Sequence, residues 1–121
     1  MNLLLIAIGG ALGSVARYLL SSFVLQVSGS LLGVGTFAVN VVGCIVFGVI
    51  AGLAERRFVF GPEARMFLLV GVLGGFTTFS TFAFESVQLL RDGQFLAAAV
   101  NIVGQVLAGV AGLWVAFAIS G

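Results

Sequence analysis

Four long apolar stretches dominate this chain and leave little of it for anything else. They cover residues 2–25, 32–54, 66–90 and 94–120 of a 121-residue sequence. Each is long enough to cross a bilayer as a helix, which takes about 20 predominantly apolar residues. Hydrophobic residues make up 61% of the chain and charged residues only 7%, which is typical of an integral membrane protein. The sequence therefore predicts an all-α membrane protein, with residues 1–121 forming a single transmembrane domain of four helices.

The residue types present argue against several functions. The chain has no His and a single Cys, Cys44, so neither an intramolecular disulfide nor a transition-metal site with the usual ligands is expected. A nucleophile paired with a base cannot be assembled within the membrane, and no room remains for a soluble catalytic domain. The net charge of +1 gives no sign of a nucleic-acid partner. We expect a membrane protein that is not an enzyme.

Eighteen glycines indicate helices in close contact, because small residues four apart let helix backbones approach. Four helices of this length enclose little on their own, so a continuous buried interior calls for a second subunit. Pro62, which follows Gly61, suits the start of a short helix or turn that leads into the third stretch. The predicted small-residue ridges are Gly9 with Gly13, Gly48 with Gly52, Gly71 with Gly75, and Gly104 with Ala108 and Gly112.

The third stretch is unusual because residues 74–82 read Gly-Gly-Phe-Thr-Thr-Phe-Ser-Thr-Phe. An unpaired hydroxyl in hydrocarbon costs on the order of several kcal/mol, so these side chains need partners. One interpretation is that each hydroxyl bonds back to its own helix, and the other is that they line a path. Two glycines before this run also predict a helix broken near its middle, whose free N–H groups attract anions and whose free carbonyls attract cations. A continuous helix packed through its glycines is the alternative.

If the chain is helical from Thr77 onward, Thr77, Thr81 and Glu85 form one polar stripe. Phe79 and Phe82 then occupy a different face, and together the two faces resemble the lining of a narrow path. The simpler interpretation of the two rings is lipid contact or packing in the core.

Polar residues in the other stretches also need partners. Asn40 lies in the middle of the second stretch, four residues after Thr36, and is either an interhelical hydrogen-bonding group or an ion ligand. Arg17 either extends to the membrane interface or has a functional charge. Asn101 and Gln105 give the fourth stretch a polar edge. Most of these groups are hydrogen-bond donors, which suits a small hydrated anion, and ring edges can assist because they are partly positive. The residues alone lead to a small anion or a proton-linked solute.

Charge placement leaves the orientation in the membrane open. Four helices put Arg56, Arg57 and Arg65 on the side of both termini, against Arg91 and Arg17 toward the other side. This bias is weak. It fits either a single orientation with the three arginines in the cytoplasm or insertion both ways, which would give an antiparallel homodimer.

Three blocks of the sequence resemble the CrcB/Fluc family of fluoride channels, and the resemblance covers most of the chain. They occur in order at the expected spacings within a four-span chain. The blocks are Gly9-Gly10 with Gly13, Arg17 and Tyr18; Gly35-Thr36 with Asn40 and Gly43; and residues 74–82 with Glu85.

This resemblance implies a dual-topology, antiparallel homodimer that passively exports fluoride across the cell inner membrane through two pathways. Phe79 and Phe82 match the paired rings that contact fluoride, and Asn40 matches the pore asparagine. Ser80 and Thr81 match the hydroxyls along the pathway.

The matching blocks also contain Thr36 and Glu85, which we place on the same pathway, and Arg17, a candidate for the vestibule. Gly74 and Thr77 match the break whose backbone carbonyls hold a structural sodium ion at the dimer centre. The fourth span departs from relatives that have Ser or Tyr on the pore side.

Two other functions fit a four-helix chain. A small proton-coupled multidrug transporter needs a carboxylate within the membrane, usually in the first helix, but the first stretch has no Asp or Glu and Glu85 is the only candidate. For a noncatalytic membrane assembly subunit, glycine-rich helix packing would suffice, and the polar residues of the third stretch would be unnecessary.

Overall fold

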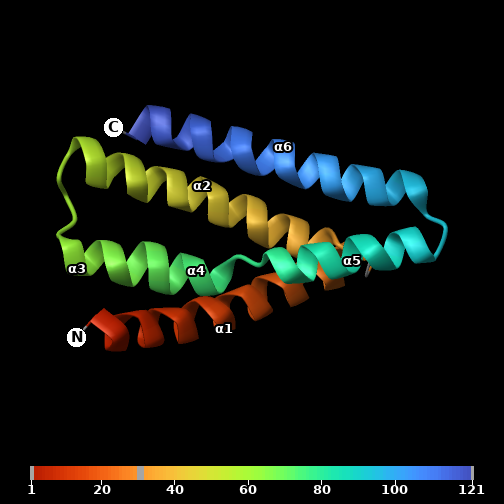
Figure 1. Cartoon of the computed structure of the whole chain (residues 1–121), viewed down its shortest axis with the longest axis horizontal. Helices are drawn as coiled ribbons and strands as arrows, with labels where there is room; N and C mark the ends of the chain where they lie inside the picture. The colour runs from red at the N-terminus through yellow and green to blue at the C-terminus, as the bar shows by residue number, and fades with distance from the viewer. Residues whose placement is uncertain (1, 30–31, 121) are drawn as a thin grey trace.

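The computed structural model describes residues 2–29 and 32–120, and every regular element in this part of the chain is helical (Figure 1). Four helical spans are long and apolar enough to cross a membrane, and they match the four predicted stretches in order. The elements are α1 (Asn2–Ser28), α2 (Val34–Arg56), α3 (Pro62–Arg65), a π-helical stretch η1 (Met66–Val72), α4 (Leu73–Phe76), α5 (Phe79–Arg91) and α6 (Phe95–Ser120). The third span comprises α3, η1, α4 and α5.

The four spans lie lengthwise beside one another, and both termini are at the same end of the bundle (Figure 1). The connection from α2 to α3 is at that end too, and the connection from α5 to α6 is at the opposite end. Helix α6 packs along α2, whereas α1 packs against η1 and α4. Because α5 packs against α6, the third span changes its neighbour from α1 to α6 halfway along its length.

Glycines make this close packing possible. A Cβ atom added at Gly9 would lie 2.7 Å from the carbonyl oxygen of Phe67, and one added at Gly75 would lie 2.6 Å from that of Gly10. Such distances are too short for real side chains, so these backbones touch directly. The predicted ridges therefore lie at helix contacts, although the ridge of α6 meets side chains, with Gly104 against the ring of Phe37 and Gly112 against Ile45.

The short helix predicted at Pro62 is present and is continuous with the third span, but the span continues in a way that was not predicted. Pro62 occupies the first turn of α3, where its missing N–H costs nothing. In η1, the hydrogen bonds skip one residue more than in an α-helix, and the N–H of Leu73 donates to the carbonyl of Leu68. Hydropathy carries no signal for such a widened turn, so the sequence analysis missed it.

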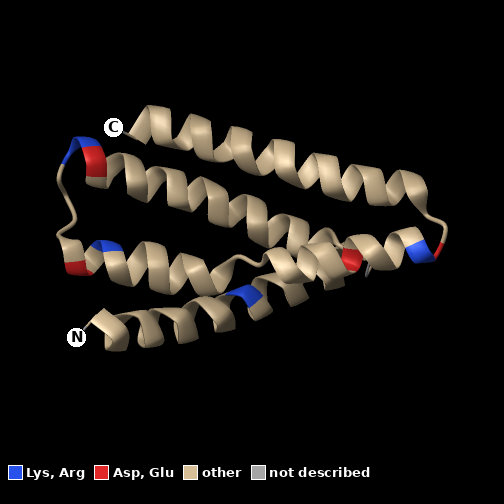
Figure 2. Ribbon diagram, viewed as in Figure 1, with Lys and Arg blue, Asp and Glu red and all other residues tan. Residues whose placement is uncertain are grey.

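Apolar side chains cover much of the outer surface of the bundle, as expected for contact with lipid or another subunit. Trp114 is 71% exposed and Leu96 80% exposed. Charged residues gather at the ends of the spans, with two exceptions away from the ends, the basic residue of α1 and the acidic residue of α5 (Figure 2). These exceptions are Arg17 and Glu85.

Candidate functional site

The helical structure of the third span stops for two residues near its middle. Helix α4 ends at Phe76, and the backbone is extended at Thr77 (φ −87°, ψ 157°) and Thr78 (φ −150°, ψ 120°) before α5 begins at Phe79. Thr77 is therefore outside α5, and the stripe expected from continuous helix is wrong at this residue. The Thr77 hydroxyl instead donates to the carbonyl of Leu73 at 3.0 Å, which is the back-bonding alternative.

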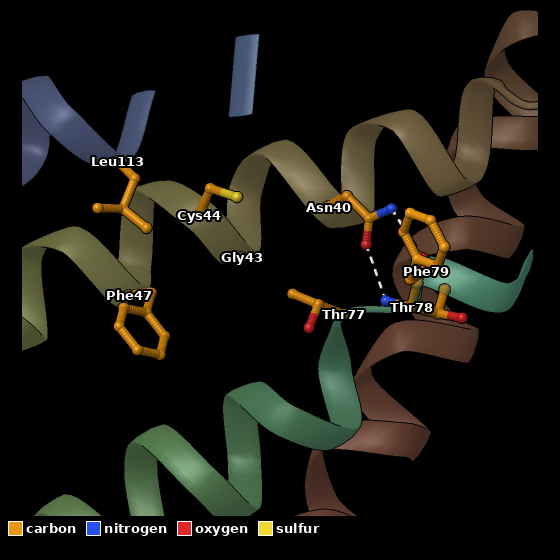
Figure 3. Close-up of a pocket in the computed structure, with 8 residues that line it drawn as sticks. All are labelled: Asn40, Gly43, Cys44, Phe47, Thr77, Thr78, Phe79 and Leu113. Carbon is orange, nitrogen blue, oxygen red and sulfur yellow. Dashed lines mark hydrogen bonds between the residues drawn. The ribbon is translucent and has the colours of Figure 1, made fainter. Parts of the chain in front are cut away.

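Asn40 of α2 holds this extended segment in place. Its Oδ1 accepts a hydrogen bond from the N–H of Thr78 at 2.9 Å, and its Nδ2 donates to the carbonyl of Thr78 at 3.0 Å (Figure 3). One amide side chain thus satisfies both backbone groups of a residue that no helix serves. The interhelical interpretation of Asn40 is confirmed, and its role as an ion ligand stays a prediction.

The same contacts leave two carbonyls without their helical donors. In a continuous helix, the N–H of Thr78 would donate to the carbonyl of Gly74, but it donates to Asn40. Likewise, the N–H of Thr81 would donate to the carbonyl of Thr77, but it donates to the hydroxyl of Thr78 at 3.3 Å, which caps α5. Gly74 and Thr77 are the two residues predicted to offer carbonyls to a cation.

Arg17 reaches the break from α1. Its Nε donates to the carbonyl of Gly75 at 3.2 Å, so its positive charge lies at the carboxyl end of α4, where the helix dipole favours a cation. Arg17 also lines a cavity of about 200 Å³ with two other predicted residues, Thr36 and Thr81. The remaining residues of this cavity are Ser14, Tyr18, Ser21, Val39 and Thr78.

A second cavity, of about 130 Å³, brings together Asn40 and the two predicted phenylalanines. Phe79 and Phe82 are tilted by 50° to one another, with ring centroids 5.6 Å apart, and Gln105 and Val106 complete the lining. Phe79 is 78% exposed, so most of its ring faces outward from this single copy of the chain.

A third cavity, of about 310 Å³, also borders Asn40 (Figure 3). Its lining combines the polar groups of the break with apolar surface of α2 and α6. The lining residues are Asn40, Gly43, Cys44, Phe47, Thr77, Thr78, Phe79 and Leu113.

Three predicted residues, Gly74, Ser80 and Glu85, line none of these three cavities. The exposed Ser80 has its hydroxyl 3.4 Å from that of Thr78. Glu85 is half-buried, and its Oε1 is completely covered and has no hydrogen-bond partner among the described residues. A covered carboxylate oxygen without a partner is rare and calls for a functional explanation.

A row of side-chain hydrogen bonds extends from Asn40 across α6 to α5. Nδ2 of Asn40 donates to Oε1 of Gln105 at 2.5 Å, and Nε2 of Gln105 donates to Oδ1 of Asn101 at 3.1 Å. Nδ2 of Asn101 then donates to the hydroxyl of Ser86 at 2.9 Å. The polar edge of α6 was predicted, but Ser86 was missed, because a serine next to Glu85 gives no signal of a partner on another span.

The chemistry that these groups offer is binding without reaction. Amide, hydroxyl and phenyl side chains line the cavities, and backbone carbonyls lie at the break. Among the described residues, no group of three or more His, Cys, Asp and Glu side chains could hold a metal ion.

Comparison with known proteins identifies the family. The family model described as CrcB-like protein, Camphor Resistance (CrcB), matches residues 4–117. A protein named fluoride-specific ion channel FluC from Nitratidesulfovibrio vulgaris (strain DSM 19637 / Miyazaki F) is 47% identical over 113 residues, which cover 93% of this chain and 91% of the relative.

Two further relatives have the same name. The protein from Maridesulfovibrio salexigens is 46% identical over 108 residues, covering 89% of this chain and 86% of the relative. The protein from Nitrosococcus oceani is 45% identical over 115 residues, covering 95% of this chain and 92% of the relative. With a family match that spans nearly its whole length and relatives this similar, the chain belongs to the CrcB-like family.

Proposed function

We propose that this protein is a fluoride-selective channel that lets fluoride leave the cytoplasm passively across the cell inner membrane. The observation that carries the proposal is the cavity in which Asn40, Gln105 and the rings of Phe79 and Phe82 converge. Relatives named fluoride-specific ion channels, at 45–47% identity over nearly the whole chain, support the choice of ion.

The lining of this cavity has the properties that a small anion requires. Fluoride holds its water tightly, so a path across the membrane must replace that water with hydrogen-bond donors. Amide N–H groups and hydroxyls are such donors, and phenyl ring edges add partial positive charge without a full cation that would trap the ion. Thr36 and Thr81, beside Arg17, would provide an entrance with the same chemistry.

The functional unit that we propose is an antiparallel dimer of two identical chains. Phe79 is 78% exposed, and Ser80 and Gly74 are exposed as well, although all three belong to the predicted site. A second copy of the chain would cover them and close the cavities, which one copy leaves open. The weak charge bias between the two ends of the bundle is compatible with insertion in both orientations.

We also propose a structural sodium ion at the break, held by the carbonyls of Gly74 and Thr77. Both carbonyls have lost the N–H donors that a continuous helix would supply, and oxygen atoms are suitable ligands for a hard cation. When bound, the ion would add positive charge close to the proposed anion route.

Fluoride efflux from liposomes tests the proposed function. Purified protein is reconstituted into vesicles loaded with potassium fluoride, and valinomycin is added while a fluoride electrode records release. We expect electrogenic release of fluoride, almost no release of chloride from matched vesicles, and no proton flux coupled to transport. Vesicles that retain fluoride but take up a cationic drug against a proton gradient would replace the channel with the multidrug transporter.

A further inference from the structure

A continuous row of hydrogen bonds connects Ser86 to Thr78 through three amide side chains. Each group in the row determines whether its neighbour presents an oxygen or a nitrogen to it. We call this row, Ser86, Asn101, Gln105, Asn40 and Thr78, the amide relay. Its members come from α5, α6, α2 and the break. Ser86, Asn101 and Gln105 are 4%, 6% and 6% exposed, so water does not compete strongly for their hydrogen bonds.

The direction of the relay is determined from the Ser86 end. A serine hydroxyl has one proton, and Ser86 donates it to the carbonyl of Phe82 at 2.8 Å. Its oxygen can therefore only accept, so the amide nitrogen of Asn101 must face it. The oxygen of Asn101 then faces Gln105, which has to present its own nitrogen.

The direction is determined independently from the other end. The backbone N–H of Thr78 can only donate, so Asn40 must present its oxygen to it. The nitrogen of Asn40 is then left to face Gln105, which must present its oxygen. Both ends thus require the same orientation of the Gln105 amide.

Counting protons shows which group remains available to an anion. The two N–H groups of Asn40 donate to the carbonyl of Thr78 and to the oxygen of Gln105. Gln105 also has two N–H groups, and the hydrogen bonds among the described residues use only the one that donates to Asn101. Because Gln105 lines the cavity beside Phe79 and Phe82, its second N–H is the amide donor left for that cavity.

We propose that Gln105 is the amide donor that contacts the anion in this cavity. Ser86 and Asn101 are positioning residues that keep the Gln105 nitrogen turned toward the cavity. This proposal rests on the proposed fluoride channel. If the relay were broken at Ser86, Asn101 could turn and present its nitrogen to Gln105, and only Asn40 would still fix the Gln105 amide. The amide would then present its oxygen, which repels an anion, to the cavity for part of the time.

The test compares fluoride efflux of variants in the same liposome assay. Gln105→Leu removes the donor, and Ser86→Ala removes the acceptor that starts the relay. We expect each to slow efflux about tenfold, the effect of losing one hydrogen bond to a charged group. Ser28→Ala is the matched control, because among the described residues the Ser28 hydroxyl bonds to a carbonyl of its own helix, that of Leu25. It is expected to transport at the wild-type rate.

The double variant separates positioning from a general structural role. If Ser86 acts through Gln105, then Ser86→Ala adds no further loss to Gln105→Leu, and the double variant matches the single one. Losses that multiply in the double variant, or a Ser86→Ala rate equal to that of Ser28→Ala, would overturn the proposal.

NMR of the side-chain amides tests the orientation of the Gln105 amide without measuring transport. The Gln105 signals, assigned by their disappearance in Gln105→Leu, are expected to shift when sodium fluoride replaces sodium chloride. That response should be lost in Ser86→Ala and kept in Ser28→Ala. Retention of fluoride by vesicles with the wild-type protein would contradict the channel proposal. Gln105 signals that are identical in wild type and Ser86→Ala would independently overturn the relay.

Discussion

Thr78 shows how a residue at a helix break can keep its own backbone groups hydrogen-bonded. Its N–H and carbonyl both bond to the Asn40 side chain, and its hydroxyl accepts from the N–H of Thr81. These three contacts satisfy both backbone groups of Thr78 and the N–H of Thr81. The break therefore depends on a side chain from another span as well as on the weak helix propensity of its own sequence.

At the same scale, the ring edges of Phe79 and Phe82 can be tested by replacing each with isoleucine. Isoleucine fills a similar volume but has no partly positive edge. We expect Phe79→Ile and Phe82→Ile each to slow fluoride efflux at least tenfold in liposomes, with dimers still seen by size-exclusion chromatography.

Phe84→Ile is the control for this pair. Phe84 belongs to the same helix and is 63% exposed, but it lines none of the three cavities described above. Its replacement should leave efflux within about twofold of wild type, the size of a typical surface effect. Equal fluoride efflux rates in all three variants would indicate that the rings of Phe79 and Phe82 serve packing alone.

The residue scale is also where sequence reasoning failed most. The need of Asn40 and of the polar edge of α6 for hydrogen-bond partners could be inferred, because an amide within a membrane requires a partner. The identity of the partner could not be inferred, since the bond from Asn40 to Thr78 joins residues 38 positions apart. Thr77 was assigned to the wrong face for the same reason, because helical periodicity does not apply across a break.

Among the elements, the third span is distinctive because it packs first on α1 and then on α6. The first of these contacts relies on backbones that touch through glycine. In Gly9→Ala, the added methyl group would lie 2.7 Å from the Phe67 carbonyl oxygen. We expect a loss of about 1–3 kcal/mol of stability, typical of overpacking, measured by thermal unfolding in detergent.

Gly61→Ala provides the comparison for that measurement. No atom of the described residues lies within 4 Å of a Cβ added at Gly61, and its φ of −73° is allowed for alanine. Its unfolding temperature should match that of wild type. A Gly9→Ala protein as stable as Gly61→Ala would show that α1 and η1 are not in direct backbone contact.

The break itself is the element that the sodium proposal concerns. If the carbonyls of Gly74 and Thr77 hold sodium, exchange of all sodium for the larger N-methylglucamine cation should reduce fluoride efflux several-fold, and added sodium should restore it. Sodium should also raise the unfolding temperature, because a ligand stabilises the folded state that binds it. Identical efflux rates and unfolding temperatures with the two cations would contradict the proposed sodium site.

Element positions were largely predictable, and local geometry was not. The largest difference in bounds is at the third span, predicted to begin at 66 and observed to begin at Pro62. Hydropathy locates spans because each must match the thickness of the bilayer. It carries no information about the hydrogen-bond register, so the widened turn of η1 could not be foreseen.

For the whole molecule, the arginines give no strong preference for one orientation. Arg56 and Arg65 end α2 and α3, and Arg57 follows α2, so all three belong to the end that carries both termini, whereas Arg91 ends α5 at the other end. We therefore expect a tag at the carboxyl terminus to be labelled from both sides of the membrane in about equal amounts, as insertion both ways requires.

Added charge provides a control for that experiment. Two extra lysines in the connection between α5 and α6 should favour one orientation, because positive loops stay in the cytoplasm. Labelling from only one side in the unmodified protein would contradict the antiparallel dimer.

The change of neighbours along the third span limits what this molecule can do mechanically. Straightening the span would pull one of its halves away from α1 or α6 and would break both hydrogen bonds from Asn40 to Thr78. The break fastens the third span to α1 on one side and to α6 on the other, so breaking and re-forming these contacts in every transport cycle would cost free energy. Such a framework suits a conduit that stands open at rest better than a carrier that must rock between two shapes.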